Sequence, residues 1–334
     1  MDISVIGAGG WGTTLAILLH LYGHRVTLWE YDKHYCKDLI KHRENKVYLP
    51  GVKIPDEMKI THELHEAYSN KHVIVLAVPS QFLRSVVKKI EYGEIKNTLL
   101  VSVAKGIENK SLLTMTQMIL DQIPQLSADQ VGALSGPSHA EEVSRMIPTA
   151  VVAASSSEVT SRDIQSAFMT PYFRVYSSID LLGVELGGAV KNVIAIGAGI
   201  IDGAKFGDNT KAAIMTRGIA EISRLGTAMG AQPATFSGLS GMGDLIVTCM
   251  SKHSRNRYVG EKIGEGKTLK QVLNSMTMVA EGVESCRSVK HLADKHNIST
   301  PIVSEVYNVL FEDKDPVRAT TDLMTRDMKS EVWK

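Results

Sequence analysis

The sequence predicts an α/β protein, with a doubly wound parallel sheet in its first half and an all-α second half. Three observations predict this fold. Short β-forming runs alternate with helical patterns up to about residue 178. One run, 73–78, is apolar throughout, as in a strand that helices cover on both faces. From Leu182 onward only helical patterns and glycine-rich turns remain, which predicts a Rossmann-like α/β domain over 1–180 and a helical domain over 181–334.

The individual elements follow from the same patterns. In the second half, Asp208 and Asn209 are suited to cap a helix that runs to Met229, and Pro233 and Gly238 interrupt the chain beyond it. The first half has strands at 3–6, 25–29, 73–78, 99–103, 131–134, 148–154 and 173–176, helices at 10–22, 81–90 and 112–123, and a helix between the last two strands.

Composition excludes several classes of protein. The 334 residues carry a net charge of only +1, so no basic field indicates nucleic acid or an anionic membrane. Cys36, Cys249 and Cys286 are isolated, which argues against a metal site and fits a reducing cytoplasm. An apolar strand begins by Ile3, which leaves no room for a signal peptide. The longest apolar run, 193–201, is about half of a membrane span. We therefore expect a soluble cytoplasmic protein without a metal.

A glycine fingerprint lies between the first strand and the first helix. Gly7, Gly9 and Gly12 match G-x-G-x-x-G, a weak pattern that becomes informative in this position. Gly7 would permit the tight turn, Gly9 the approach of a pyrophosphate, and Gly12 close packing of helix on strand. The free N–H groups at the helix N-terminus suit that anion. The alternative is a tight turn without a ligand.

The second strand ends at Glu30, 18 residues after Gly12. A carboxylate near this position hydrogen-bonds the ribose hydroxyls of the adenosine in dinucleotide-binding folds. The alternative is a solvated surface glutamate.

A single cation, Lys191, lies between Arg174 and Lys205, in a helix that is apolar on nearly every face. The glycines of this segment cost helix stability, which suggests that another backbone or a ligand approaches them. A buried ammonium with a lowered pKa suits proton transfer to and from an alcohol oxygen. The alternatives are a lysine that reaches the surface or one that pairs with Glu185.

Two loops follow neighbouring strands. Lys105 follows the strand at 99–103, and Gly136 and Ser138 follow the strand at 131–134. Ligands bind beyond the carboxyl ends of strands in open α/β sheets, so we expect both loops at one crevice. A turn with a helix cap explains the second loop equally well.

Two further segments carry polar groups in the second half. A glycine-rich loop ends in Asp244, and Ser254, Arg255 and Asn256 follow ten residues later with groups that suit a phosphate. The alternative is a helix capped near Ser254 with a solvated arginine. The segment 279–282 is a polar break between helices, without a role that its chemistry reveals.

Taken in order, these segments closely resemble the bacterial NAD(P)-dependent glycerol-3-phosphate dehydrogenases over nearly the whole chain. The most specific runs are 134–142 (LSGPSHAEE), 183–192 (GVELGGAVKN) and 253–256 (HSRN). The resemblance implies reversible oxidation of sn-glycerol 3-phosphate to dihydroxyacetone phosphate, which supplies phospholipid synthesis, by a homodimer. It implies Lys191 as the proton acceptor. It implies substrate contacts from Lys105, Gly136, Ser138, Lys191, Asp244, Ser254, Arg255 and Asn256, and cofactor contacts from Gly10, Trp11, Tyr31, Tyr48, Lys105, Ala140, Arg255, Val279 and Glu281.

The chain departs from the family pattern at two places. Family members often have serine where this chain has Gly10. They also often have a small and then a basic residue after the second strand, where this chain has Glu30-Tyr31-Asp32. The acidic Glu30 favours NAD over NADP.

Two other functions fit parts of the pattern. A β-hydroxyacid dehydrogenase would share the helical-domain lysine, but its substrate ends in a carboxylate, whereas 253–256 with Lys105 suits a phosphate. An NAD-sensing regulator would need no buried lysine, and no nucleic-acid-binding module is visible in the sequence.

Overall fold

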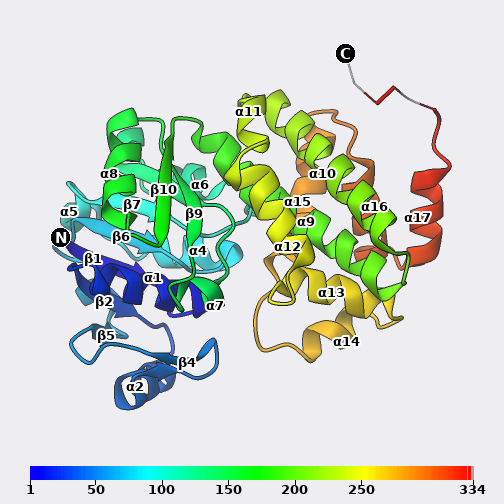
Figure 1. The fold of residues 1–334 in the computed structure, drawn as a ribbon. Helices are drawn as coiled ribbons and strands as arrows, with labels where there is room; N and C mark the ends of the chain where they lie inside the picture. The colour runs from blue at the N-terminus through cyan, green and yellow to red at the C-terminus, as the bar shows by residue number, and fades with distance from the viewer. Residues whose placement is uncertain (329, 332–334) are drawn as a thin grey trace.

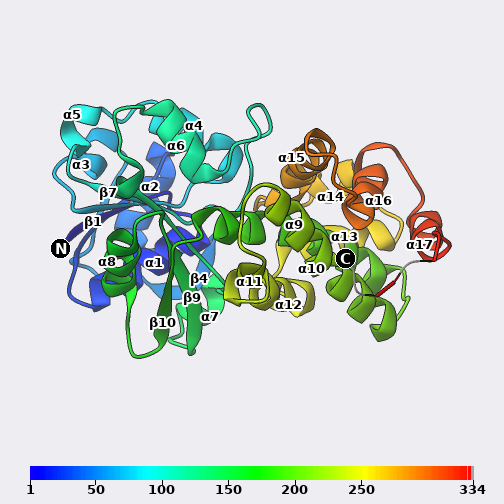
Figure 2. The same ribbon diagram turned by 90° about the horizontal axis from the view of Figure 1, so that it is seen from above.

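The computed structural model describes residues 1–328 and 330–331. It has a sheet flanked by helices, which lies beside a helical half (Figure 1, Figure 2). The long helix α9 (Leu181–Gly203) directly follows the strand β10 (Phe173–Ser178) and leads into the helical half.

Eight strands form the main sheet, in the order β10-β9-β8-β7-β6-β1-β2-β5. All neighbours are parallel, as predicted, except β8 and β9, which are antiparallel, so the structure departs from the predicted parallel sheet at this one pair. The link between them holds only the four-residue helix α7 (Ala140–Val143), which is too short to return the chain to the other end of the sheet. The remaining strands are β1 (Asp2–Ile6), β2 (Arg25–Trp29), β5 (Lys59–Thr61), β6 (Val73–Leu76), β7 (Leu99–Ser102), β8 (Val131–Ser135) and β9 (Thr149–Ala154).

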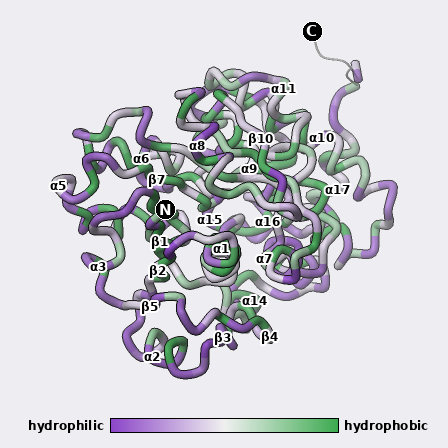
Figure 3. The backbone as a smooth tube through the Cα atoms, turned by 60° about the vertical axis from the view of Figure 1, so that its left-hand side comes forward, coloured by the Kyte–Doolittle hydropathy of each residue, from purple (hydrophilic) through white to green (hydrophobic). Residues whose placement is uncertain are grey.

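Helices cover both faces of this sheet, which confirms the doubly wound prediction. Ile3 and Val5 of β1 pack with α1 and α8, whereas Ile6 packs with α4 and α6 on the other face. In Figure 3, α1 is coloured mainly hydrophobic and the segments around α3 and α5 mainly hydrophilic. The helices of this half are α1 (Gly10–Leu21), α2 (Lys33–His42), α3 (Leu64–Tyr68), α4 (Ser80–Val87), α5 (Tyr92–Ile95), α6 (Met115–Gln122), η1 (Ala128–Gln130) and α8 (Glu158–Phe168).

The segment between β2 and β6 contains elements that the sequence analysis missed. These are α2, the small antiparallel pair β3 (Glu44–Asn45) and β4 (Leu49–Lys53), and the edge strand β5. Only Cys36 and Leu39 of α2 are buried, so its apolar face is too narrow to stand out.

The second half is built around α9, most of whose residues are buried. The glycines of α9 and α13 admit neighbouring backbones, as expected, because a Cβ at Gly199 would overlap the carbonyl of Arg257, and one at Gly260 the carbonyl of Ile196. The other helices are α10 (Asp208–Ala228), α11 (Pro233–Phe236), the π-helical turn η2 (Leu239–Gly243), α12 (Asp244–Met250), α13 (Arg255–Gly264), α14 (Leu269–Asn274), α15 (Glu281–Lys295), α16 (Pro301–Phe311) and α17 (Pro316–Met324).

Two expectations about these helices need correction. Asp208 and Asn209 lie inside α10, and the capping residue is Gly207, which has no side chain to make a cap bond. The apolar segment around Lys191 is also longer than the run 193–201 suggests. By length and composition α9 could cross a membrane, but its most apolar window is 100% buried inside the protein, as in the core helix of a globular domain.

Candidate active site

The glycine fingerprint forms a tight turn at the N-terminus of α1. Gly7 has a φ of 114°, and a Cβ there would lie 2.8 Å from the carbonyl oxygen of Ala77. A Cβ at Gly12 would overlap the carbonyl of Gly7, whereas one at Gly9 would meet no atom within 4 Å. The turn therefore needs glycine at 7 and 12 for packing, and Gly9 leaves open space where a pyrophosphate can approach.

A second loop lies against this turn. A Cβ at Gly10 would lie 2.6 Å from the carbonyl oxygen of Tyr48, so glycine is needed here for more than its backbone N–H. The buried Asn45 joins the two segments, because its Nδ2 donates to the Ala8 carbonyl at 2.8 Å and its Oδ1 accepts from the Tyr48 N–H at 2.9 Å. Asn45 belongs to the β3–β4 hairpin, which no sequence pattern indicates.

Trp11 and Ala140 complete the surroundings of the turn. The Trp11 ring lies 6.4 Å from that of Phe173, and its buried Nε1 has no hydrogen-bond partner in the described part of the chain. Thr14 of α1 donates to the Ala140 carbonyl at 3.3 Å. An orphaned donor beside an open turn fits a polar ligand such as a dinucleotide at this place.

Glu30 lies at the end of β2, next to the fingerprint. Its Oε1 accepts from the Asp32 N–H at 2.9 Å. Burial raises the pKa of Glu30, and backbone N–H groups, including that of Ala8, oppose this shift. Tyr31 is 74% exposed, and Lys89 Nζ lies 5.9 Å from the centre of its ring. The carboxylate is thus half-buried and near the first glycine turn, not free in solvent.

Lys191 lies where the two halves of the chain meet. Its Nζ donates to Thr248 Oγ1 at 2.7 Å and lies 3.0 Å from Asp244 Oδ1. The other Asp244 oxygen accepts from Lys105 Nζ at 2.7 Å. One buried carboxylate from α12 therefore holds two lysines, one from α9 and one from the loop after β7. Thr248, which the sequence analysis missed, follows Asp244 by one helical turn.

The electrostatics of this cluster depend on burial. Lys191 is 5% exposed, and desolvation lowers its pKa to about 8, although Asp244 opposes that shift and Lys105 adds to it. Burial acts to raise the pKa of Asp244, but the two lysines hold it below its usual value. Neither alternative for Lys191 holds: it does not reach the surface, and Glu185 instead accepts hydrogen bonds from Thr114 and Thr116.

The loops after β7 and β8 do lie together, as expected. Lys105 Nζ donates to the Gly136 carbonyl at 2.9 Å, and Ser138 Oγ donates to the same carbonyl at 3.1 Å. Gly136 has a φ of 140°, and a Cβ there would lie 2.9 Å from the Cα of Val151. Only glycine fits this turn, which brings the β8 loop to the lysine cluster.

Asn192 and Asn256 connect this cluster to the later helices. Asn192 Nδ2 donates to the Lys105 carbonyl at 3.2 Å, and its Oδ1 accepts from Asn256 Nδ2 at 2.9 Å. Asn256 Oδ1 in turn accepts from the Gly282 N–H at 2.9 Å. Of the residues 254–256, Asn256 is thus the one that hydrogen-bonds Asn192, which follows Lys191 in the chain. No role was predicted for Asn192 from the sequence.

Ser254 and Arg255 are placed differently. Ser254 caps α13, with its Oγ accepting from the Arg257 N–H at 3.2 Å, so the expectation of a helix capped here is confirmed. Arg255 is exposed, and it donates to the Val279 carbonyl at 3.0 Å. Glu281 accepts from the Ser80 N–H at 2.9 Å and so joins α15 to the start of α4.

His139 is a further neighbour that the sequence analysis did not single out. Burial, followed by the charges of Lys191 and Lys105, lowers the pKa of its imidazole. Its ring centre lies 5.9 Å from that of His253, and its buried Nε2 has no hydrogen-bond partner within the described residues. His139 thus places a neutral ring near the two lysines.

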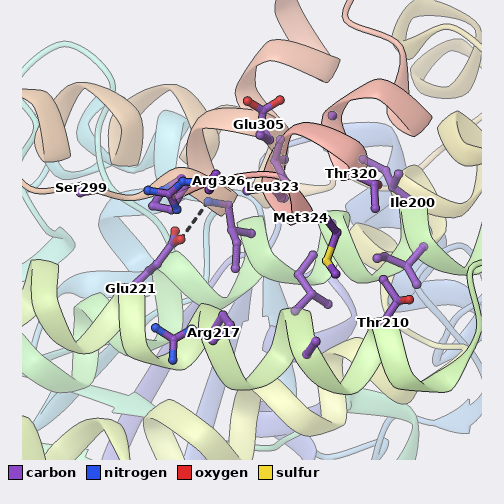
Figure 4. Close-up of a pocket in the computed structure, with 18 of the residues that line it drawn as sticks. Ile200, Thr210, Arg217, Glu221, Ser299, Glu305, Thr320, Leu323, Met324 and Arg326 are labelled. Atoms are coloured by element: carbon purple, nitrogen blue, oxygen red, sulfur yellow. Dashed lines mark hydrogen bonds between the residues drawn. The ribbon is translucent and has the colours of Figure 1, made fainter. Parts of the chain in front are cut away.

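A separate cavity of about 500 Å³ lies between α9, α10, α16 and α17. Figure 4 shows Glu221 pointing from α10 toward the start of α16, where it accepts from the Ile302 N–H at 2.8 Å. The cavity contains none of the predicted site residues. Among residues 1–328 and 330–331, no group of three or more His, Cys, Asp or Glu could hold a metal ion, and the three cysteines are free and buried.

The arrangement can therefore do two things. A glycine turn with a neighbouring carboxylate is suited to hold a dinucleotide, and a buried lysine with a pKa of about 8 is suited to exchange a proton near neutral pH. Lys105 shares Asp244 with that lysine, Ser138 shares the Gly136 carbonyl with Lys105, and Asn256 bonds to Asn192, the next residue after Lys191.

Comparisons with known proteins give one consistent result. The family described as NAD-dependent glycerol-3-phosphate dehydrogenase matches with its N-terminal part over residues 2–161 and its C-terminal part over 180–321. Glycerol-3-phosphate dehydrogenase of Fusobacterium nucleatum, named for NAD(P)+, is 50% identical over 332 residues, which are 99% of each chain. The enzyme of the same name from Prosthecochloris aestuarii is 51% identical over 99% of this chain and 100% of its own.

A solved structure agrees with these relatives. The crystal structure of glycerol-3-phosphate dehydrogenase from Coxiella burnetii superposes with a TM-score of 0.91 at 35% identity, over 97% of this chain and 99% of that chain. The resemblance inferred from the sequence is thereby confirmed. The chain belongs to the family of NAD-dependent glycerol-3-phosphate dehydrogenases.

Proposed function

We propose that this protein interconverts sn-glycerol 3-phosphate and dihydroxyacetone phosphate with NAD(P), and that Lys191 moves the proton. The observation that carries the proposal is the buried lysine held by Asp244 and Thr248, with its pKa lowered to about 8. At this pKa both the ammonium and the free amine are populated near neutral pH, so one group serves both directions.

In reduction, the Lys191 ammonium donates its proton to the carbonyl oxygen of dihydroxyacetone phosphate, which becomes the C2 hydroxyl. In oxidation, the free amine takes that proton back. When bound, the nicotinamide cofactor supplies or accepts the hydride at C2. Asp244 holds the lysine at 3.0 Å from its Oδ1 and supports the charged form. One ketone, one proton and one hydride give one alcohol, so the reaction balances.

The polar groups around Lys191 are proposed to bind the substrate. Lys105 and Arg255 provide positive charge for a phosphate, and Arg255 can offer two parallel N–H donors. Ser254 caps α13, whose N-terminus also favours an anion. The substrate contacts proposed are those of Lys105, Gly136, Ser138, Lys191, Asp244, Ser254, Arg255 and Asn256.

For the cofactor, we place the pyrophosphate at the fingerprint turn and the adenosine ribose at Glu30. The Glu30 carboxylate supports a preference for NAD, because it can accept from ribose hydroxyls and would repel a 2′-phosphate. The cofactor contacts proposed are those of Gly7, Gly9, Gly10, Trp11, Gly12, Glu30, Tyr31, Tyr48, Lys105, Ala140, Arg255, Val279 and Glu281.

The wider setting is proposed from family resemblance. We assign cofactor binding to residues 1–180 and substrate binding to 181–334, with a homodimer as the working form. The product would supply phospholipid synthesis in the cytoplasm. The protein is proposed to act on a small molecule, without a nucleic-acid or membrane partner.

The experiment is to assay reduction of dihydroxyacetone phosphate by the purified protein, with NADH and NADPH in parallel. A panel of β-keto acids serves as the comparison, since a β-hydroxyacid dehydrogenase would reduce those instead. We expect turnover of dihydroxyacetone phosphate and none of the keto acids. Cofactor binding without turnover of any substrate would identify a sensor and contradict the proposal.

A further inference from the structure

Arg257 is a largely buried arginine outside the residues to which a role has been assigned. Its guanidinium bonds in three directions. Nε donates to the Ser251 carbonyl at 3.2 Å, one terminal nitrogen lies 2.5 Å from Asp202 Oδ2, and the other lies 3.0 Å from Glu261 Oε2. The side chain is only 12% exposed.

Two of these bonds act on the segment that carries Ser254, Arg255 and Asn256. The bond to the Ser251 carbonyl closes the turn 251–257 from one side, and the Ser254 side chain accepts from the Arg257 N–H inside it. The bond to Asp202 ties the same turn to α9. Asp202 follows Lys191 by eleven residues on that helix, or about 16 Å along its axis.

The backbones of α9 and α13 already lie in close contact. A Cβ at Gly203 would overlap the carbonyl of Glu261, and a Cβ at Gly264 would overlap that of Ile200. This packing fixes α13 on α9, but the turn before α13 is irregular. Beside the bond from Asn256 to Asn192, Arg257 supplies the side-chain bonds that connect the Ser251 end of that turn to α9.

We propose that Arg257 and Asp202 are positioning residues, which set the distance between the phosphate-binding segment 254–256 and the proton-transferring Lys191. The inference rests on the proposed function, because it assumes that 254–256 contact a phosphate. Without Arg257, the Asn256–Asn192 bond would hold one end of the segment to α9, but the turn 251–255 before it would shift. Substrate bound through its phosphate would then no longer present its carbonyl correctly to Lys191. Small displacements of this kind cost large factors in rate.

Lys211 provides a matched control. From α10 it donates to both Asp202 oxygens, at 2.9 and 2.8 Å. Lys211→Met therefore removes a positive partner of Asp202, as Arg257→Met does, but leaves the bond from Arg257 to the Ser251 carbonyl in place.

The test compares the wild type with Arg257→Met, Arg257→Lys, Asp202→Asn and Lys211→Met in the full-length protein. It measures KM and kcat for dihydroxyacetone phosphate, kcat/KM for unphosphorylated dihydroxyacetone, and the inhibition constant of inorganic phosphate. For Arg257→Met we expect kcat/KM for dihydroxyacetone phosphate to fall, and the phosphate inhibition constant to rise, each by about tenfold or more, since a bond to a charged group is lost. The kcat/KM for dihydroxyacetone should stay within about twofold. In the values for dihydroxyacetone phosphate and for inorganic phosphate, Asp202→Asn should change in the same direction as Arg257→Met, and Arg257→Lys should be intermediate. Lys211→Met should stay near the wild type in both.

Two results would overturn the inference. One is a folded Arg257→Met whose kcat/KM for dihydroxyacetone phosphate and phosphate inhibition constant both stay within about twofold of the wild type. The other is an equal loss on both substrates, which would show a merely structural role. If Arg257→Met does not fold, Arg257→Lys and Asp202→Asn decide by the same two criteria. A wild type that fails to reduce dihydroxyacetone phosphate would instead refute the proposed function itself.

Discussion

Asp244→Asn should move the pH dependence of reduction toward lower pH. The carboxylate lies 3.0 Å from Lys191 Nζ and 2.7 Å from Lys105 Nζ, and it supports the charged form of Lys191. Asparagine keeps the shape and an acceptor oxygen but removes the negative charge. Burial and Lys105 then both act to lower the pKa of Lys191, without the group that opposed them.

The size of the shift follows from the distance. A unit charge at 3.0 Å contributes about 1.4 kcal/mol at a dielectric constant of 80 and about 5.5 kcal/mol at 20. One pKa unit is about 1.4 kcal/mol, so removing this charge should lower the pKa of Lys191 by about one to four units. Because asparagine retains a hydrogen-bond acceptor, we take the lower end. The pKa of Lys191 should fall from about 8 to about 7 or below.

The assay is kcat/KM for dihydroxyacetone phosphate at saturating NADH from pH 6 to 10. This quantity reports the pKa values of the enzyme with NADH bound, before the substrate binds. Reduction needs the ammonium, so the rate should fall as pH rises through the pKa of Lys191. The midpoint should lie near 8 in the wild type and near 7 or below in the variant. At pH 8 the protonated fraction would drop from about one half to about one tenth, or about fivefold. Asp208→Asn makes the same charge change at an exposed position and should leave the midpoint in place. An unmoved or raised midpoint in Asp244→Asn would refute the assignment of the titration to Lys191.

Two further predictions concern recognition. Glu30→Ala should reduce the preference for NADH over NADPH, which we expect to be about 10- to 150-fold in the wild type from the hydrogen bond alone. The ratio of kcat/KM for the two cofactors measures this preference. A wild type that favours NADPH, or a ratio that Glu30→Ala leaves unchanged, would show that Glu30 does not contact the ribose. Arg255→Ala should lower kcat/KM more for dihydroxyacetone phosphate than for dihydroxyacetone. Arg255→Lys should remain impaired, because an ammonium lacks the bidentate geometry of a guanidinium. Equal losses of kcat/KM on both substrates would exclude a phosphate contact.

Much of the fold follows from local patterns in the sequence. β1, β2 and β6 are short apolar runs between turn residues, and the structure places all three in the main sheet. The segment 33–61 could not be predicted in the same way, because its elements are short and largely exposed. The reversal at β9 depends on the length of α7, which no periodicity indicates.

The candidate site, too, could be predicted from the sequence only in part. Lys191 stands out because a charge in an apolar helix is costly, and this reasoning needs no tertiary information. Its partner could not be found so simply. Glu185 precedes Lys191 by six residues, which places it on a different face of α9, whereas Asp244 comes from a helix 53 residues later. Asn45, Thr248 and Asn192 act through bonds to distant backbone or side-chain groups, so their roles appear only once the chain is folded.

The most direct measurement of the central claim is kcat of Lys191→Met for dihydroxyacetone phosphate reduction, with the affinity for NADH measured on the same preparation. Methionine preserves length and packing, and the lowered pKa of Lys191, about 8, shows that its surroundings already disfavour the ammonium, so the variant should fold. If Lys191 moves the proton, kcat should fall about 100- to 10,000-fold while NADH binds as in the wild type. Turnover near the wild-type rate in a folded variant would contradict the account.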